Sequence, residues 1–510
     1  MYYLGIDIGT SGTKTVLFDS KGQALAAASA EYPLSQPASS YAEQAPEDWW
    51  RAVRETLSEV VAAAAKQGIA ASKIGGIGLS GQMHGLVMLD KKGEVIRPAI
   101  IWCDQRTAAE CGEITEKVGE KRLIEITANP ALTGFTASKI LWVKNHEPEN
   151  YQRCRQILLP KDYIRYKLTG AFAAEMSDAS GMQLLDVPRR CWSDEVLERL
   201  GIDGALLAPV YESTEITGRV SAEAAAATGL SAGTPVVGGA GDNAAAAVGT
   251  GVVEDGRAFT TIGTSGVVYA HSSRVAIDPK GRVHTFCCAV PGQWLIMGVT
   301  QGAGLSLKWF RDQFCSAEKE TAALLGRDPY SLLDQVAASV PLGSRQLLYL
   351  PYMMGERTPH LDPAARGVFF GLSALHGKKE MLRAVMEGVA FSLKDCQQII
   401  AGMDIPVTDM MACGGGGTSA LWREMLADLY GCPVKTPAAR EGPALGAAIL
   451  AMVGVGEYAS VPEACRAIIH VDRVQLPDPD ASKAYQPYYK LYTELYPALK
   501  ASFKVLDEIR

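Results

Sequence analysis

The chain has 510 residues, too many for one hydrophobic core, because single cores stop growing near about 250–300 residues. Hydrophobic residues make up 48% and charged residues 21%, and the net charge of −7 comes from 49 Lys and Arg against 56 Asp and Glu. This balance, without any basic cluster, excludes a nucleic-acid surface. We therefore expect two large domains and no nucleic-acid partner.

The N-terminal segment and the cysteines both predict a cytoplasmic protein. Residues 1–14 reach Asp7 without a basic or an apolar leader region, so no signal peptide is expected. No apolar run is long enough to span a bilayer, which predicts no membrane contact. The 11 cysteines are odd in number and scattered, which argues against a disulfide framework or a zinc site.

An internal repeat divides the chain into two halves. Residues 8–12 and residues 262–266 both read Ile-Gly-Thr-Ser-Gly. An apolar strand precedes each copy, and a β-prone run follows it. A strand, a glycine turn and a second strand at corresponding points of two halves predict an ancient duplication.

The predicted elements along the chain alternate between strands and helices. In the first half a third strand follows the turn at 19–22, a helix spans 46–66 with Pro46 near its start, and a buried strand spans 74–79. The helices predicted in the second half span 379–400, 419–430 and 444–453. A three-stranded meander followed by strands and helices, present twice, indicates an α/β protein.

This pattern resembles the actin-like ATPase fold, a duplicated ribonuclease H-like fold that binds ATP in a central cleft between two domains. We place the domains at residues 1–252 and 253–510. Helices from about residue 480 are expected to pack back on the body.

Phosphate binding is predicted at the glycine turns, because the chain has no Walker A loop and no protein-kinase signature. Backbone N–H groups and hydroxyls in Gly-Thr-Ser-Gly turns can form anion-binding concavities. A single turn of this kind is more often a plain hairpin. Two copies, with Asp7 before the first and Lys14 after it, favour a phosphate site.

The turns resemble the first and second phosphate motifs of actin-like ATPases, and residues 414–417 resemble the adenosine motif. The alternative for residues 414–417 is a flexible loop before a helix. The predicted nucleotide-binding residues are Gly9, Thr10, Ser11, Lys14, Gly263, Thr264, Ser265, Gly414, Gly415, Gly416 and Gly417.

Asp242 is the candidate general base. It precedes an Ala-rich helical stretch, so Asp242 or Asn243 could simply be a helix N-cap. Phosphoryl transfer to a sugar hydroxyl, however, needs a carboxylate that accepts the hydroxyl proton. We expect a carboxylate at a helix N-terminus to stay ionised and to point in a fixed direction. Because the second phosphate turn follows shortly after Asp242, we favour the base.

Two polar loops that follow short strands are candidates for a polyol pocket. The first carries Met83 and His84, which can supply an apolar wall and a hydrogen bond to a hydroxyl. The alternative is a histidine satisfied within a turn. The second loop places Asp104 between a Trp and Arg106, and its alternative is a surface Asp–Arg pair beside a packed Trp.

Longer patterns resemble the FGGY family of carbohydrate kinases over nearly the full chain. They lie at residues 134–146, 355–359 and 367–388. Residues 82–85 and 159–163 resemble the family members that phosphorylate D-xylulose. Glycerol kinases carry an Arg-Glu pair where this chain has Met83 and His84.

The resemblance implies an enzyme that uses ATP and Mg²⁺ to convert D-xylulose to D-xylulose 5-phosphate, and we expect a homodimer. The implied roles are proton acceptor for Asp242, sugar contacts for Met83 and His84, and organiser of Mg²⁺ and phosphate for Asp7, with Asp104 and Asn243 as weaker sugar-site candidates. The alternatives are family kinases acting on ribulose, gluconate or glycerol. A non-catalytic actin-fold ATPase is a more distant alternative, because it needs no base for a sugar hydroxyl.

Overall fold

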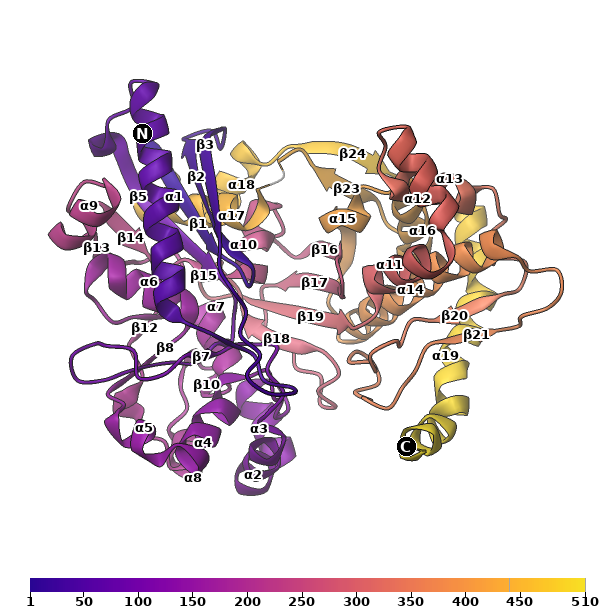
Figure 1. Ribbon diagram of the computed structural model, residues 1–510, viewed down its shortest axis with the longest axis horizontal. Helices are drawn as coiled ribbons and strands as arrows, with labels where there is room; N and C mark the ends of the chain where they lie inside the picture. The colour runs from indigo at the N-terminus through magenta and orange to yellow at the C-terminus, as the bar shows by residue number, and fades with distance from the viewer. Residues whose placement is uncertain (440, 510) are drawn as a thin grey trace.

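The computed structural model describes residues 1–439 and 441–509, which fold around two seven-stranded sheets (Figure 1). The strands of the first sheet lie between residues 2 and 241, and those of the second between residues 256 and 475. We call the elements packed around these sheets the first lobe and the second lobe. Figure 1 shows them side by side, the first lobe mainly indigo to magenta and the second mainly pink to yellow.

The sheet of the first lobe begins with a meander. Its strands are β1 (Tyr2–Ile8), β2 (Gly12–Asp19), β3 (Ala24–Glu31), β5 (Ile74–Gly81), β13 (Ile216–Arg219), β14 (Pro235–Val237) and β15 (Ala240–Gly241). The order is β13-β14-β5-β1-β2-β3, and β15 also pairs with β5. The first three strands pair antiparallel, whereas β5 and β14 return parallel, as expected after helical crossovers.

The sheet of the second lobe repeats this path. Its strands are β16 (Gly256–Ile262), β17 (Gly266–Ser272), β18 (His284–Cys287), β19 (Trp294–Thr300), β22 (Val407–Cys413), β23 (Val434–Pro437) and β24 (Val471–Gln475). The order is β18-β19-β17-β16-β22-β23-β24. When the edge strands β13, β18 and β24 are left out, the two sheets have the same order. The first runs β3-β2-β1-β5-β14 and the second runs β19-β17-β16-β22-β23, in each case a meander followed by two parallel strands. The predicted duplicated ribonuclease H-like fold is confirmed.

Helices cover both sheets and fill the connections between strands. The main helices of the first lobe are α1 (Pro46–Lys66), α2 (Ala108–Val118), α3 (Glu120–Thr127), α4 (Thr136–His146), α6 (Pro160–Thr169), α7 (Met176–Ala179), α8 (Asp194–Leu200) and α10 (Asp242–Gly249). Those that begin after the second sheet starts are α11 (Ala303–Phe314), α12 (Ser316–Leu324), α13 (Pro329–Ala338), α14 (Lys378–Gly402), α16 (Ala420–Tyr430), α17 (Gly442–Gly454), α18 (Val461–Ile468) and α19 (Pro479–Glu508). Helix α1 spans the predicted residues, with Pro46 in its first turn and Lys66 at its end.

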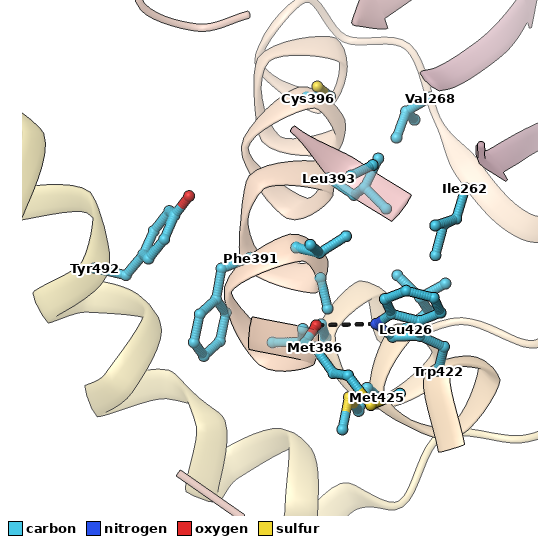
Figure 2. Packing of buried hydrophobic residues seen from close by; sticks show 14 of the residues in the cluster. Ile262, Val268, Met386, Phe391, Leu393, Cys396, Trp422, Met425, Leu426 and Tyr492 are labelled. Carbon is cyan, nitrogen blue, oxygen red and sulfur yellow. Dashed lines mark hydrogen bonds between the residues drawn. The ribbon is translucent and has the colours of Figure 1, made fainter. Parts of the chain in front are cut away.

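Helix α14 forms the centre of the core of the second lobe (Figure 2). The indole Nε1 of Trp422 donates a hydrogen bond of 2.9 Å to the carbonyl oxygen of Met386. On the other side, the ring centroids of Phe391 and Tyr492 lie 5.3 Å apart. Helix α14 is therefore packed between α16 and the C-terminal helix α19.

Helix α17 comes late in the chain but packs on the sheet of the first lobe (Figure 1). A Cβ atom on Gly5 of β1 would lie 1.8 Å from the carbonyl oxygen of Ala444, and one on Gly446 would lie 1.9 Å from that of Ala245. Only glycine permits this approach of backbones. The contact between α17 and α10 holds the start of α10 at the junction of the two lobes.

Two segments differ from the sequence predictions. The region from about residue 480 forms one 30-residue helix, α19, instead of several, and neither Pro487 nor Pro497 ends it. Its buried Tyr485 and Tyr492 attach it to the second lobe. Residues 414–417 form a short helix, α15 (Gly414–Gly417), and not a loop.

In residues 1–439 and 441–509, no helix has the length and apolar character needed to cross a membrane.

Candidate active site

Three strand ends of the first lobe meet at one point. Asp7 of β1 lies opposite Ser80 of β5, and Ala240 of β15 lies opposite the same Ser80 on the other side. Ser80 Oγ donates a 2.7 Å hydrogen bond to Asp7 Oδ1. Because these strands are parallel, Asp7, the loop that carries His84 and the start of α10 at Asp242 converge at one edge of the sheet.

Asp242 is the first residue of α10, and Gly241 is the N-cap residue. The N-cap alternative for Asp242 is therefore wrong by one position, because the extended Gly241 already begins the helix. Asp242 Oδ1 accepts hydrogen bonds from the backbone N–H (2.7 Å) and side-chain Nδ2 (3.1 Å) of Asn243. The structure thus places Asn243 beside the predicted base.

Burial, together with the negative charge of Asp7, raises the pKa of Asp242 to about 7. Burial also raises the pKa of Asp7, although its hydrogen bond from Ser80 and the charge of Lys14 oppose that effect. The raised pKa runs against the expectation that a helix N-terminus keeps Asp242 fully ionised, because burial disfavours the charged form. A carboxyl with a pKa near neutrality suits general-base catalysis.

A buried network that the sequence analysis missed holds the strand end before Asp242. Ser177 Oγ accepts a 3.1 Å hydrogen bond from the N–H of Gly241 and donates one of 2.8 Å to Glu175 Oε2. Lys161 Nζ lies 3.8 Å from Glu175 Oε2 and 3.5 Å from Asp178 Oδ2, and all three side chains are fully buried. Because 64 residues separate Ser177 from Gly241, no local spacing in the sequence could reveal the contact.

His84 adopts a left-handed backbone conformation with φ of 68°. Its Nδ1 lies 2.9 Å from the carbonyl oxygen of Gly181. Its own carbonyl oxygen accepts hydrogen bonds from Lys139 Nζ (2.8 Å) and Thr136 Oγ1 (3.1 Å). Burial lowers the pKa of His84 to about 3, so the imidazole is neutral and can donate to or accept from a hydroxyl.

Met83 of the same loop packs against Gly241, the residue before the base. Its side chain is 6% exposed, and a Cβ atom on Gly241 would lie 2.8 Å from Met83 Cγ. The structure therefore brings Met83, His84, Asp242 and Asn243 together. Lys139, which fixes the backbone of His84, belongs to the pattern at 134–146, but its fully buried position could be seen only in three dimensions.

Asp104 is fully buried and has protein partners on both carboxylate oxygens. Arg106 donates to both oxygens, and the N–H of Ala42 donates to Oδ2 at 2.6 Å. The alternative of a surface pair is therefore wrong, because this ion pair is internal. The neighbouring Trp102 is 43% exposed, and its Nε1 donates to Thr10 Oγ1 at 2.8 Å, which joins this loop to the first glycine turn.

The two Gly-Thr-Ser-Gly turns both close hairpins, but with different hydrogen bonds. The N–H of Gly9 donates to the carbonyl oxygen of Gly12, three residues on, whereas that of Gly263 donates to the carbonyl oxygen of Ser265, two residues on, both at 3.0 Å. Lys14, after the first turn, is partly exposed and forms an ion pair of 2.5 Å with Glu441. The second turn is also fastened to the start of α11.

A pocket of about 410 Å³ opens beside the second turn. Its walls include Gly263, Thr264, Gly415 and Gly416, four of the predicted nucleotide-binding residues. Ser265, Gly414 and Gly417 belong to the same segments but do not line it, and neither do Gly9, Thr10, Ser11 and Lys14. The sequence analysis missed the opposite wall, which is formed by Lys308, Tyr330, Ser331, Asp334 and Trp422 of helices α11, α13 and α16.

Asp7 and Asp242 are the carboxylates available for a metal ion at this site. Mg²⁺ is commonly bound by one or two carboxylates together with substrate phosphates and water. Both carboxyls have a raised pKa, and the charge of Asp7 contributes to the raised pKa of Asp242. A divalent cation between them would relieve this unfavourable negative charge. The pair fits Mg²⁺ bound with a nucleotide, whereas no group of three or more protein ligands occurs in the described residues.

Comparison with known proteins identifies the family. The model of the N-terminal domain of the FGGY family of carbohydrate kinases matches residues 2–249, and that of the C-terminal domain matches residues 258–455. The chain is 39% identical to a xylulose kinase of Bacillus subtilis (strain 168), covering 100% of this chain and 99% of that protein, and 34% identical to a gluconokinase of the same strain, covering 97% and 95%. It matches the crystal structure of ligand-bound xylulose kinase from Lactobacillus acidophilus with a TM-score of 0.90, 30% identity and 99% coverage of each chain. The chain therefore belongs to the FGGY family of carbohydrate kinases.

Proposed function

We propose that this sugar kinase transfers the γ-phosphoryl group of ATP to the terminal hydroxyl of D-xylulose, giving ADP and D-xylulose 5-phosphate. The observation that carries the proposal is the junction of strands β5 and β15, where Gly81 pairs with Gly241. This pairing sets the His84 loop, which suits a polyol, directly beside the candidate base Asp242. Full-length similarity to xylulose kinases supplies the identity of the sugar.

In this mechanism, Asp242 accepts the proton of the 5-hydroxyl as its oxygen attacks the γ-phosphorus. Asn243 holds the accepting carboxylate through its backbone and side-chain N–H groups. Met83 and His84 bind the sugar carbons and hydroxyls on the adjoining loop. Asp104 stays a candidate sugar contact, although its oxygens already have partners within the protein.

The second glycine turn and α15 are proposed to bind the nucleotide in the pocket between α11, α13 and α16. Glycine backbone at residues 263 and 415–416 allows the ligand to approach closely. The first turn and Lys14 are proposed to face the phosphate end of the ATP. Asp7 would hold Mg²⁺, which neutralises charge on the phosphates when it is bound.

The domain division at residues 252 and 253 and the homodimer remain predictions, as does the cytoplasmic location. The model of the N-terminal domain ends at residue 249 and that of the C-terminal domain begins at residue 258, on either side of the proposed boundary.

A coupled assay of ADP release tests the function across pentuloses, hexuloses, gluconate and polyols. We expect the largest kcat/KM with D-xylulose. A larger kcat/KM with gluconate would replace D-xylulose by a sugar acid, in line with the similarity to a gluconokinase. If no sugar stimulates ADP release, the proposal that this site phosphorylates a sugar is wrong.

A further inference from the structure

The segment Gly355–Pro359 of the second lobe is fastened to the end of strand β19. The N–H of Thr358 donates to the carbonyl oxygen of Val299 (2.9 Å), and the N–H of Val299 donates to Thr358 Oγ1 (3.1 Å). Thr358 Oγ1 also donates to the carbonyl oxygen of Arg282, at 2.7 Å. These three bonds fix the backbone next to Arg357 between strands β18 and β19.

Glu356 fixes the same backbone from the other side. Its Oε1 accepts hydrogen bonds from the N–H groups of Gln301 (2.8 Å) and Arg357 (2.7 Å). Gln301 lies two residues before the start of α11, where Gly304 donates from its N–H to the carbonyl oxygen of Gly263. Arg357 therefore extends from a rigid point of the second lobe, close to the junction with the first.

The side chain of Arg357 has no acceptor. Its guanidinium forms neither a hydrogen bond nor an ion pair with any residue in the described ranges 1–439 and 441–509, and burial lowers its pKa. Arg357 is partly exposed, and none of its nitrogens is both fully buried and unpaired. Its N–H donors are therefore available to a ligand that enters the site.

The surroundings of Arg357 identify which part of the active site it faces. Thr358, next to Arg357, donates to the carbonyl oxygen of Arg282, two residues before His284 in β18. The rings of His284 and of His84 from the first lobe both pack against Phe286, with centroids 5.6 Å and 6.0 Å from it. The positive charge of Arg357 also helps to lower the pKa of both histidines. Arg357 thus lies at the histidine end of the site.

This position can be related to the ends of the sugar, if the proposed function holds. When the 5-hydroxyl of D-xylulose faces Asp242, the 2-ketone and the 1-hydroxyl point to the opposite end of the site. The guanidinium carries several N–H donors in a planar fork, which suits two neighbouring oxygen acceptors. We propose that Arg357 is a sugar contact supplied by the second lobe, donating hydrogen bonds to the ketone oxygen and the neighbouring hydroxyl of the ketose.

Such a contact would make the ketose itself connect the lobes, because Met83 and His84 bind it from the first lobe and Arg357 from the second. It would also favour a ketose over the polyol formed by reducing the ketone. A carbonyl oxygen needs only donors, whereas the hydroxyl formed by reduction also needs an acceptor for its proton, and a guanidinium offers none. The alternative, in which Arg357 binds the transferring phosphoryl group, makes a different kinetic prediction.

The test compares Arg357→Met and Arg357→Lys with wild type, and Arg366→Met serves as a control because Arg366 is paired with Asp507 at the surface of the same lobe. We expect Arg357→Met to raise the KM for D-xylulose by about 10- to 100-fold, the range for a charge-assisted hydrogen bond. The KM for ATP should stay close to wild type, and the inhibition constants of xylitol and D-arabinitol should rise by less than the KM for D-xylulose, because the pentitols lack the ketone. Arg357→Lys should fall between, and thermal unfolding identifies a variant that does not fold.

Three results would overturn the proposal. A loss of kcat with an unchanged sugar KM would assign Arg357 to the phosphoryl group. An equal rise in the KM for D-xylulose and in the inhibition constants of the pentitols would show that Arg357 does not contact the ketone. Wild-type kinetics in a folded Arg357→Met would show that Arg357 does not contact the substrate. If wild type prefers another sugar, the proposed function fails separately. A tenfold rise in the KM for that sugar would then still support the second-lobe contact, and an unchanged KM would overturn it.

Discussion

The two glycine turns share a sequence but neither the same strand register nor the same chemical environment, since Ile8 pairs with Thr13 whereas Ile262 pairs with Gly266. Residues 8–12 and 262–266 are identical, and each turn joins two antiparallel strands at the start of its sheet. In the first copy Asp7 precedes the turn and Lys14 follows it. The corresponding residues of the second copy are Thr261 and Val268, so the second copy carries no charge at these positions.

The two glycine turns also differ in the residues that surround them. The second turn borders the 410 Å³ pocket, whereas the first lies beside Ser80 and the sugar loop. The same five residues therefore stand in two different settings, and the charged side chains occur at the first turn alone. We infer that the second turn binds the nucleotide while the first, with Asp242, serves the transfer step.

The largest effect is expected for the carboxyl that the first lobe supplies as base. Asp242→Asn should lower kcat by about 10²–10⁴-fold, the usual contribution of a general base, and leave ATP binding close to wild type. Asp194→Asn is the matched control, because Asp194 is also the first residue of a helix but is exposed. If Asp242→Asn keeps more than a third of wild-type turnover, another group is the base.

The corresponding positions before the two turns, Asp7 and Thr261, are expected to differ in their effect on kcat. Asp7→Asn should lower kcat by about 10²–10³-fold, as for the loss of one electrostatic contact to the transition state. Thr261→Val should stay near wild type, because no charge is removed there. Steady-state kinetics at several Mg²⁺ concentrations measure both, and equal losses in the two variants would show that the turns are not specialised.

His84→Ala tests the sugar side of the first lobe. We expect the KM for D-xylulose to rise by about 10-fold, as for the loss of one or two hydrogen bonds, with the KM for ATP unchanged. The exposed His470→Ala should leave both constants unaltered. An unchanged sugar KM and kcat in His84→Ala would make this histidine structural.

The smallest difference is expected between the two threonines of the turns. Thr264→Val removes a hydroxyl that lines the nucleotide pocket and should raise the KM for ATP by about 2- to 10-fold, as for one neutral hydrogen bond. Thr10→Val removes the acceptor of the Trp102 indole and should raise the KM for ATP by less than Thr264→Val does, because the first turn is proposed to face only the phosphate end of the ATP. An equal rise in both variants would show that the two turns contribute equally to ATP binding.

Much of the fold was readable from local patterns, since the repeated turn, the helix from Pro46 and the strand order of the meander depend on neighbouring residues. The contacts that complete the site were not, because they join distant segments. Ser177 holds Gly241, Lys139 holds His84, and Arg357 approaches from the other lobe. Burial also changed the chemistry, since a helix N-terminus alone predicts an ionised Asp242, whereas its pKa is raised to about 7.

In the proposed mechanism, buried Asp242 is the base of this sugar kinase, and the negative charge of Asp7 raises its pKa. The pH dependence of kcat/KM for D-xylulose tests it most directly, because that profile reports the essential groups before sugar binds. The base must be ionised, so activity should rise with pH through a midpoint near 7. In Asp7→Asn the midpoint should move to lower pH, because removing a negative charge favours ionisation of Asp242, whereas the titration of the substrates stays the same. A profile that is flat between pH 5 and 8, or an Asp7→Asn midpoint equal to that of wild type, would contradict the account.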